Sequence, residues 1–121
     1  MKTGKWTPPI AWAALIEVLT SWPRMPTFGA PAGTDKVVHF FLYGVFGVLV
    51  ARAAAGGRPS FRSAVAIVIV LSAWGALDEW HQRFIDGRTA DIADWVTDTA
   101  AVMVGVAARA RYARMREVRV A

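Results

Sequence analysis

The sequence contains no cysteine and only two histidines. The absence of cysteine excludes disulfide bonds, thiolate metal ligands and a cysteine nucleophile. The chain also has no glycine-rich phosphate-binding loop, no dinucleotide-binding fingerprint and no HExxH zinc motif. The informative features must therefore be sought in the distribution of apolar and charged residues.

Acidic residues are fewer than basic ones, nine against fourteen, and hydrophobic residues make up 55% of the chain. Four apolar windows occupy nearly all of the 121 residues, which is typical of a small polytopic membrane protein. We predict one all-α domain over residues 1–121, an integral membrane protein whose four transmembrane helices form a compact bundle. The predicted helices cover about residues 7–22, 35–55, 61–84 and 92–113, and a basic tail covers residues 109–121.

The ends of the predicted helices carry residues that start or stop helices. Thr34, Ser60 and Asp91 are suitable N-caps for the second, third and fourth helices. The third helix is predicted to end near Gly87, because glycine is the usual residue for a left-handed C-terminal cap. Small residues that let neighbouring helices approach closely are Gly44, Gly47, Ala51, Ala101 and Gly105.

The charges at the helix ends predict the orientation of the chain. With four spans, both termini and the turn after the second helix lie on one side of the membrane. That side has ten basic residues against four, so the positive-inside rule makes it the cytoplasmic side. The ten are Lys2, Lys5, Arg52, Arg58, Arg62, Arg109, Arg111, Arg114, Arg116 and Arg119, and the four are Arg24, Lys36, Arg83 and Arg88.

Both ends of the chain have an alternative interpretation. A cleavable signal peptide is the alternative for the first helix, but the Ala30-Pro31-Ala32 triplet lies some ten residues past the apolar core and Glu17 interrupts that core. Nucleic-acid binding is the alternative for the arginine-rich tail, but no nucleic-acid-binding fold signal accompanies it. The predicted partners of the tail are anionic membrane lipids. The sequence does not indicate an oligomeric state.

Carboxylates gather at the opposite, outer end of the predicted bundle. Eight of the nine acidic residues fall there, and both histidines join them. Residues three or four apart share a helix face, so three helices each present a polar stripe, and together the stripes predict an outward-facing polar pocket. The stripes are Asp35, His39 and Tyr43; Asp78 or Glu79 with Gln82; and Asp91, Asp94 and Asp98.

The outer carboxylates outnumber the four outer cations two to one. Some carboxylates must therefore be exposed, protonated, hydrogen-bonded or bridged by a bound cation. We interpret Asp86 and Asp91 as a solvated loop residue and a helix cap. The others are harder to explain as structure, because ionisable groups inside a membrane are costly to retain without a function. Those predicted to be functional are Asp35, His39, Glu79 and Asp94.

The polar residues also form three ordered motifs. The first is Asp35-Lys36-Val37-Val38-His39-Phe40 followed by Tyr43, the second is Asp78-Glu79 with Gln82, Phe84 and Gly87-Arg88, and the third is Asp94 and Asp98 before Ala101. Together they resemble the VanZ-like family of small bacterial membrane proteins, over about residues 35–105. The resemblance implies a compact helical membrane domain. The family takes its name from a member associated with resistance to the glycopeptide teicoplanin.

The resemblance implies a place in the cell envelope more than a particular reaction. The sequence departs from the family pattern at Asp98, where the family often has Asn, at Ala101, where it often has Gly, and at Asp91, which replaces a common Ser. These departures imply a more acidic site and a looser contact of the fourth helix. The positions that carry over are Asp35, Lys36, His39, Tyr43, Asp78, Glu79, Gln82, Phe84, Arg88 and Asp94.

We expect the outer pocket to bind a lipid-linked or cell-wall-related ligand, and we leave open whether the protein is an enzyme. The N-termini of the second and fourth helices, with Lys36, Arg83 and Arg88, suit an anionic head group. In a reaction, the hypothetical catalytic residues are Glu79 or Asp94 as general base and His39 as proton shuttle. The residues predicted to bind are Asp35, Lys36, Tyr43, Asp78, Gln82, Arg88 and Asp98.

Three further hypotheses stay open. No cofactor is indicated, but a divalent cation is an alternative on the hard oxygen ligands of four carboxylates. A small multidrug-type transporter would use Glu17 as its coupling site. The strong charge bias between the two ends of this chain is unusual for that class. A structural subunit would use the polar stripes for packing against partner helices. The four carboxylates of the cation hypothesis are Asp35, Asp78, Glu79 and Asp94.

Overall fold

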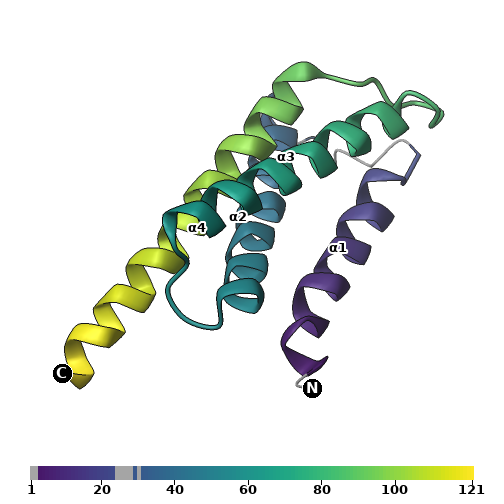
Figure 1. Cartoon of the computed structure of the whole chain (residues 1–121). Helices are drawn as coiled ribbons and strands as arrows, with labels where there is room; N and C mark the ends of the chain where they lie inside the picture. Colours follow the sequence, from purple (N-terminus) through teal and green to yellow (C-terminus); the bar gives the residue numbers. More distant parts are fainter. Residues whose placement is uncertain (1–2, 24–28, 30) are drawn as a thin grey trace.

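The computed structural model describes residues 3–23, 29 and 31–121. Within these residues the chain has four α-helices, a 3-10 helix at Thr3–Lys5 and no strand, which confirms the predicted all-α fold. The α-helices are α1 (Thr7–Thr20), α2 (Thr34–Ala55), α3 (Phe61–Gln82) and α4 (Ile92–Val120) (Figure 1). Lys2 and Arg24 of the charge count, and Ala30 of the triplet, lie outside the described residues.

Three helix ends differ from the prediction. Gly33 is the N-cap of α2 at a φ of 88°, which only glycine adopts readily, and Thr34 is already helical. α3 ends at Gln82, although Gly87 does adopt a positive φ of 79° in the turn that follows. α4 runs to Val120, because its basic end is rich in the good helix formers arginine and alanine. The basic residues therefore extend a helix instead of forming a separate tail.

The predicted N-caps of α3 and α4 are present in the structure. The Ser60 hydroxyl accepts the backbone N–H of Ser63 at 3.1 Å, and the Asp91 carboxylate accepts that of Ala93 at 2.9 Å. Each bond satisfies a donor that has no partner within the helix. Gly56 ends α2 in the left-handed conformation, with φ at 65°.

α2 and α4 make the most extensive helix contact, and small residues form it. A Cβ atom placed on Gly105 would lie 2.1 Å from the carbonyl oxygen of Gly44. A Cβ atom on Gly47 would lie 2.8 Å from the carbonyl oxygen of Val102. The two backbones therefore touch directly, as the spacing of small residues predicts.

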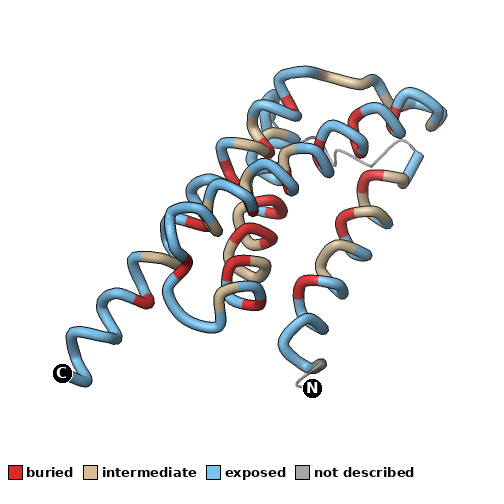
Figure 2. The backbone as a smooth tube through the Cα atoms, in the orientation of Figure 1, coloured by how far each residue is buried: buried red, intermediate tan, exposed pale blue. Residues whose placement is uncertain are grey.

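Seven polar or charged residues are buried beside the apolar core, while many large apolar residues are exposed. Figure 2 shows buried and exposed positions alternating along each helix. Asp98 is only 1% exposed, whereas Phe41 on α2 and Ile69 on α3 are 62% and 63% exposed. An exposed apolar surface of this extent is unusual for a soluble monomer. The distribution is the one expected where the surroundings of the bundle are themselves apolar.

Two of the described helices, α2 and α3, are long and apolar enough to cross a membrane. α1 is apolar but has only 14 residues, and α4 carries charged residues near both of its ends. Length and composition therefore support two of the four predicted spans. Figure 1 shows both ends of the chain, and the turn between α2 and α3, at the same end of the bundle.

Replacing Gly105 by alanine should destabilise the protein, because the new Cβ has no room beside the backbone of Gly44. Overpacking of this kind costs about 1–3 kcal/mol. The control is Gly57→Ala, where a Cβ meets no atom within 4 Å. Thermal unfolding of the purified proteins in detergent should show a lower Tm only for Gly105→Ala. Equal melting temperatures for the two variants would contradict the close α2–α4 contact.

Candidate functional site

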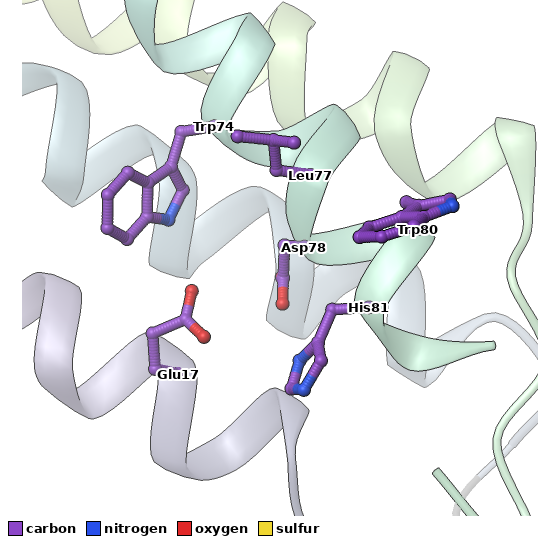
Figure 3. A pocket seen from close by; sticks show the side chains of 6 residues that line it. All are labelled: Glu17, Trp74, Leu77, Asp78, Trp80 and His81. Carbon is purple, nitrogen blue, oxygen red and sulfur yellow. The ribbon is translucent and has the colours of Figure 1, made fainter. Parts of the chain in front are cut away.

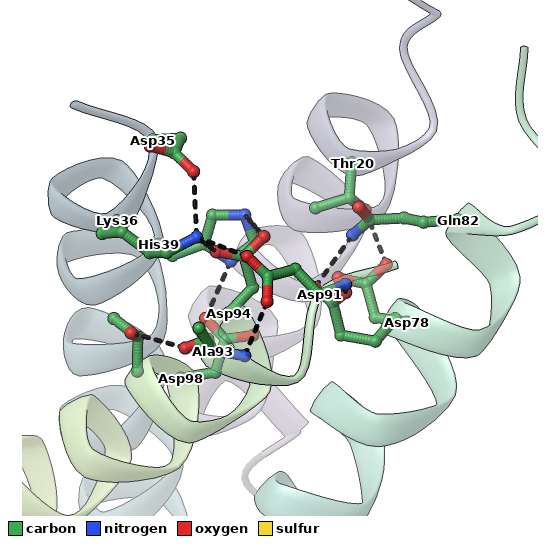
Figure 4. Close-up of polar contacts among 12 residues, drawn as sticks. Thr20, Asp35, Lys36, His39, Asp78, Gln82, Asp91, Ala93, Asp94 and Asp98 are labelled. Carbon is green, nitrogen blue, oxygen red and sulfur yellow. Dashed lines mark hydrogen bonds and ion pairs between the residues drawn. The ribbon is translucent and has the colours of Figure 1, made fainter. Parts of the chain in front are cut away.

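Two groups of polar side chains lie at the end of the bundle opposite both termini (Figure 4). They meet at α2, where the rings of His39 and Tyr43 are stacked 6.5 Å apart. The first group, which we call the His39 cluster, consists of Asp35, Lys36, His39, Glu79, Asp91, Asp94 and Asp98. The second group, the Asp78 cluster, consists of Glu17, Thr20, Tyr43, Asp78 and His81.

In the His39 cluster the ammonium of Lys36 lies among three carboxylates. Its Nζ donates to Asp35 at 3.1 Å, to Asp91 at 2.9 Å and to Asp94. The hydrogen bond from the ammonium lowers the pKa of the Asp91 carboxyl below its usual value. These bonds join the start of α2 to the start of α4. Lys36 is therefore fully engaged within the protein and is not a free cation for a head group.

The imidazole of His39 is held between two carboxylates of α4. Its Nδ1 lies 2.9 Å from Asp98 Oδ1, and its Nε2 lies 4.0 Å from Asp94 Oδ2. The three side chains are 9%, 1% and 11% exposed, in the order His39, Asp98 and Asp94. A carboxylate on Nδ1 favours the tautomer that carries its proton there, which leaves the Nε2 lone pair facing Asp94.

Glu79 connects the end of α3 to this cluster. Its Oε2 accepts the backbone N–H of Asp91 at 2.9 Å, and its Oε1 lies 3.5 Å from the amide nitrogen of Gln82. Both side chains are buried. The loop after α3 is thereby tied back onto the last turn of α3, and this positions Asp91 for its contacts with Lys36.

In the Asp78 cluster one buried carboxylate joins three helices. Asp78 on α3 accepts hydrogen bonds from Thr20 of α1 at 2.8 Å and from Tyr43 of α2 at 3.1 Å. On its other side the carboxylate borders a cavity of about 280 Å³ between α1 and α3 (Figure 3). The cavity is lined by Glu17, Trp74, Leu77, Asp78, Trp80 and His81.

The structure separates the four carboxylates that the sequence suggested for a cation. Asp78 belongs to the second cluster, and Asp35 is an exposed partner of Lys36. The described residues instead offer two groups whose ligand atoms lie within 4.8 Å of one another. One is His39 with Glu79 and Asp94, all buried, and the other is Glu17 with Asp78 and His81, which is partly exposed.

Arg88 has a different environment from the head-group contact expected of it. Its guanidinium donates to the carbonyl oxygens of Leu19 at 2.8 Å and Trp22 at 3.1 Å. These oxygens lie at the end of α1, where carbonyl groups have no partner within the helix. Arg88 therefore closes the C-terminal end of α1 and ties it to the loop after α3.

Sequence reasoning brought together most of this site but missed Thr20. The predicted stripes of α2, α3 and α4 do face one another, and Tyr43 and Gln82 are both in contact with the predicted carboxylates. Thr20 lies three residues after Glu17, on the same face of α1. A polar residue at that spacing in an otherwise apolar helix was the signal that could have identified it.

Replacing Tyr43 by phenylalanine should destabilise the protein by about 1–3 kcal/mol, because buried Asp78 loses one of its two donors. The matched control is Tyr112→Phe, since Tyr112 is half exposed. The free energy of unfolding in detergent gives both values. In an Asp78→Asn background the same change should cost less, because a neutral amide depends less on the lost donor. Equal costs in the two backgrounds would show that the Tyr43 hydroxyl does not act through Asp78.

One family model, described as VanZ/LLP1, matches residues 5–110. The match includes α1, α2, α3 and most of α4, and it contains every residue of the His39 and Asp78 clusters. No curated protein and no solved structure matches the chain.

Proposed function

The chain belongs to the VanZ/LLP1 family, and we propose that it is a multi-pass protein of the bacterial cytoplasmic membrane that binds a lipid-linked or cell-wall-related ligand of the envelope. The proposed site is the His39 cluster, and the proposed consequence is lower susceptibility to glycopeptides such as teicoplanin. The observation that carries the proposal is the burial of His39, Glu79, Asp94 and Asp98 together. Such groups are costly in an apolar bundle unless they serve a function.

The distribution of side chains supports the membrane assignment. Exposed apolar residues occur on all four helices, including Ile10 on α1 and Met103 on α4. We propose that α1 and the apolar part of α4 cross the membrane beside α2 and α3, and that both termini are cytoplasmic. The basic end of α4 then lies at the cytoplasmic surface, next to anionic lipids. The buried His39 cluster then lies near the outer end of the bundle, and its exposed member Asp35 is on the side from which an envelope ligand would approach.

The charges of the cluster indicate which part of a ligand it accepts. Lys36 and Arg88 already have protein partners, so a bare anionic head group would have to displace existing bonds. The carboxylates instead suit the amine and hydroxyl groups of a cell-wall-related ligand. In a reaction on that ligand, Glu79 or Asp94 is the base and His39 relays the proton.

Glu79→Gln should abolish protection of a glycopeptide-sensitive host that expresses this protein, because it removes a carboxylate from the buried cluster. The matched control is Asp86→Asn, which removes an exposed carboxylate outside both clusters. The measurement is the minimal inhibitory concentration of teicoplanin at equal membrane abundance. The parent and Asp86→Asn should raise it by the same factor.

Two results would count against this function. Protection that survives Glu79→Gln at equal abundance would show that the His39 cluster is not the site. A low abundance of Glu79→Gln, with normal protection per molecule, would indicate that the cluster only holds the helices together, as in a structural subunit.

A second function, proton-coupled efflux of organic cations, is favoured by one observation. Glu17 borders the cavity between α1 and α3, beside Asp78 and the indole rings of Trp74 and Trp80. Carboxylates and aromatic rings are the groups that attract organic cations.

On this hypothesis, Glu17→Gln should stop proton-driven efflux of a cationic dye from vesicles, because the coupling carboxylate is lost. Glu117→Gln, at the exposed end of α4, is the control and should leave efflux unchanged. Parent vesicles that export no dye would exclude this function.

A further inference from the structure

Three buried side chains of the His39 cluster, one from each of α2, α3 and α4, present atoms that can bind a metal ion. His39, Glu79 and Asp94 each place a ligand atom within 4.8 Å of the other two, and His39 Nε2 lies 4.0 Å from Asp94 Oδ2. The ligands of a tetrahedral ion with bonds of about 2.0–2.2 Å are about 3.4 Å apart. Small side-chain rotations would therefore close the three atoms around an ion.

Each carboxylate in this group has one oxygen that accepts a short hydrogen bond and one that does not. Asp94 uses Oδ1 to accept from Lys36, which leaves Oδ2 directed to the imidazole. Glu79 uses Oε2 to accept from the backbone of Asp91, and its Oε1 has only the long 3.5 Å contact with Gln82. The existing hydrogen bonds thus hold both carboxylates in place and leave each of them an oxygen that can bind an ion.

Asp98 supplies a second, independent indication. Its Oδ1 lies on His39 Nδ1 at 2.9 Å, and such a carboxylate–histidine pair is the usual outer support of a metal-bound imidazole. Its other oxygen, Oδ2, is fully buried and has no hydrogen-bond partner among the described residues. A buried carboxylate with an unpaired oxygen is unfavourable unless positive charge lies close by.

The charges of the whole cluster point the same way. The five carboxylates of the cluster have one permanent cation among them, the ammonium of Lys36. A protonated His39 would still leave the cluster strongly negative. With His39 neutral, the five carboxylates and the ammonium of Lys36 give the cluster a net charge of −4, and a divalent cation at its centre would halve that charge.

We propose that His39, Glu79 and Asp94 bind a divalent transition-metal ion of the zinc class, with Asp98 as the positioning residue for His39. An imidazole with two carboxylates suits such an ion, whereas Mg²⁺ and Ca²⁺ prefer oxygen ligands alone. Three protein ligands leave a fourth position open for an oxygen atom of the bound ligand. This inference rests on the proposed function, because the open position would bind a hydroxyl or amine group of the same envelope ligand. It assigns His39, Glu79 and Asp94 to metal binding in place of the acid–base roles.

The first experiment titrates ZnCl₂ into the chelator-treated full chain in detergent, by isothermal calorimetry. The parent should bind about one ion per chain, and MgCl₂ should give no comparable binding. Glu79→Gln and Asp94→Asn should weaken Zn²⁺ binding by at least about 100-fold, and Asp98→Asn by about 10–100-fold, as expected for an outer support. Two controls should bind Zn²⁺ like the parent: Asp86→Asn, and Glu17→Gln from the other acidic group.

A second measurement does not depend on the folding of acidic-site variants. Co²⁺ replaces Zn²⁺ in such sites, and its visible absorption reports the ligand set. The parent should give the bands of a tetrahedral or five-coordinate site with one imidazole. His39→Gln, which keeps an amide donor for Asp98, should lose them.

The outcomes separate this inference from the proposed function. Absence of Zn²⁺ binding by the parent, or its loss in Glu17→Gln with retention in Glu79→Gln, would overturn the metal site. Glycopeptide protection by a protein that binds no metal would leave the proposed function standing and remove only the inference. Stoichiometric Zn²⁺ binding without glycopeptide protection would support the metal site and count against the proposed function.

Discussion

The contact between the backbones of α2 and α4 determines how the polar side chains of these two helices meet in the His39 cluster. Gly105 lies so close to Gly44 that no side chain fits between them. Both helices begin at the end of the bundle opposite the chain termini and run in the same direction (Figure 1). Turns of α2 therefore face turns of α4 at the same depth. His39 therefore meets Asp98, and one turn closer to the end of the bundle Lys36 meets Asp94.

α3 completes the arrangement with two adjacent carboxylates that face different neighbours. Asp78 turns toward α1 and α2, where Thr20 and Tyr43 donate to it, and Glu79 turns toward the start of α4. Successive residues on a helix point about 100° apart, so one dipeptide serves two clusters. Asp78 itself accepts from two neutral donors, whereas the His39 cluster has five carboxylates against the one ammonium of Lys36. This difference makes the His39 cluster the better candidate for a ligand site.

Much of this arrangement could be predicted from local patterns. The apolar windows predicted four helices, the caps Ser60 and Asp91 predicted two starting points, and helical spacing grouped His39 with Asp35 and Tyr43. These features depend on residues close together in the sequence. The end of α3 was misplaced, because a glycine with a positive φ occurs in a turn as readily as at a helix cap.

The sequence by itself determined the helical fold, the apolar character of the chain and the set of polar residues at one end. It also determined the small residues through which α2 and α4 touch. Only the tertiary structure decided which partners these residues have. In the structure, Arg88 donates to a carbonyl group at the end of α1, and Asp78 and Glu79 face different clusters. His39 lies between Asp94 and Asp98. Helical periodicity specifies which face a residue occupies. The rotation and depth of one helix against the next depend instead on packing between distant residues, which no local pattern encodes.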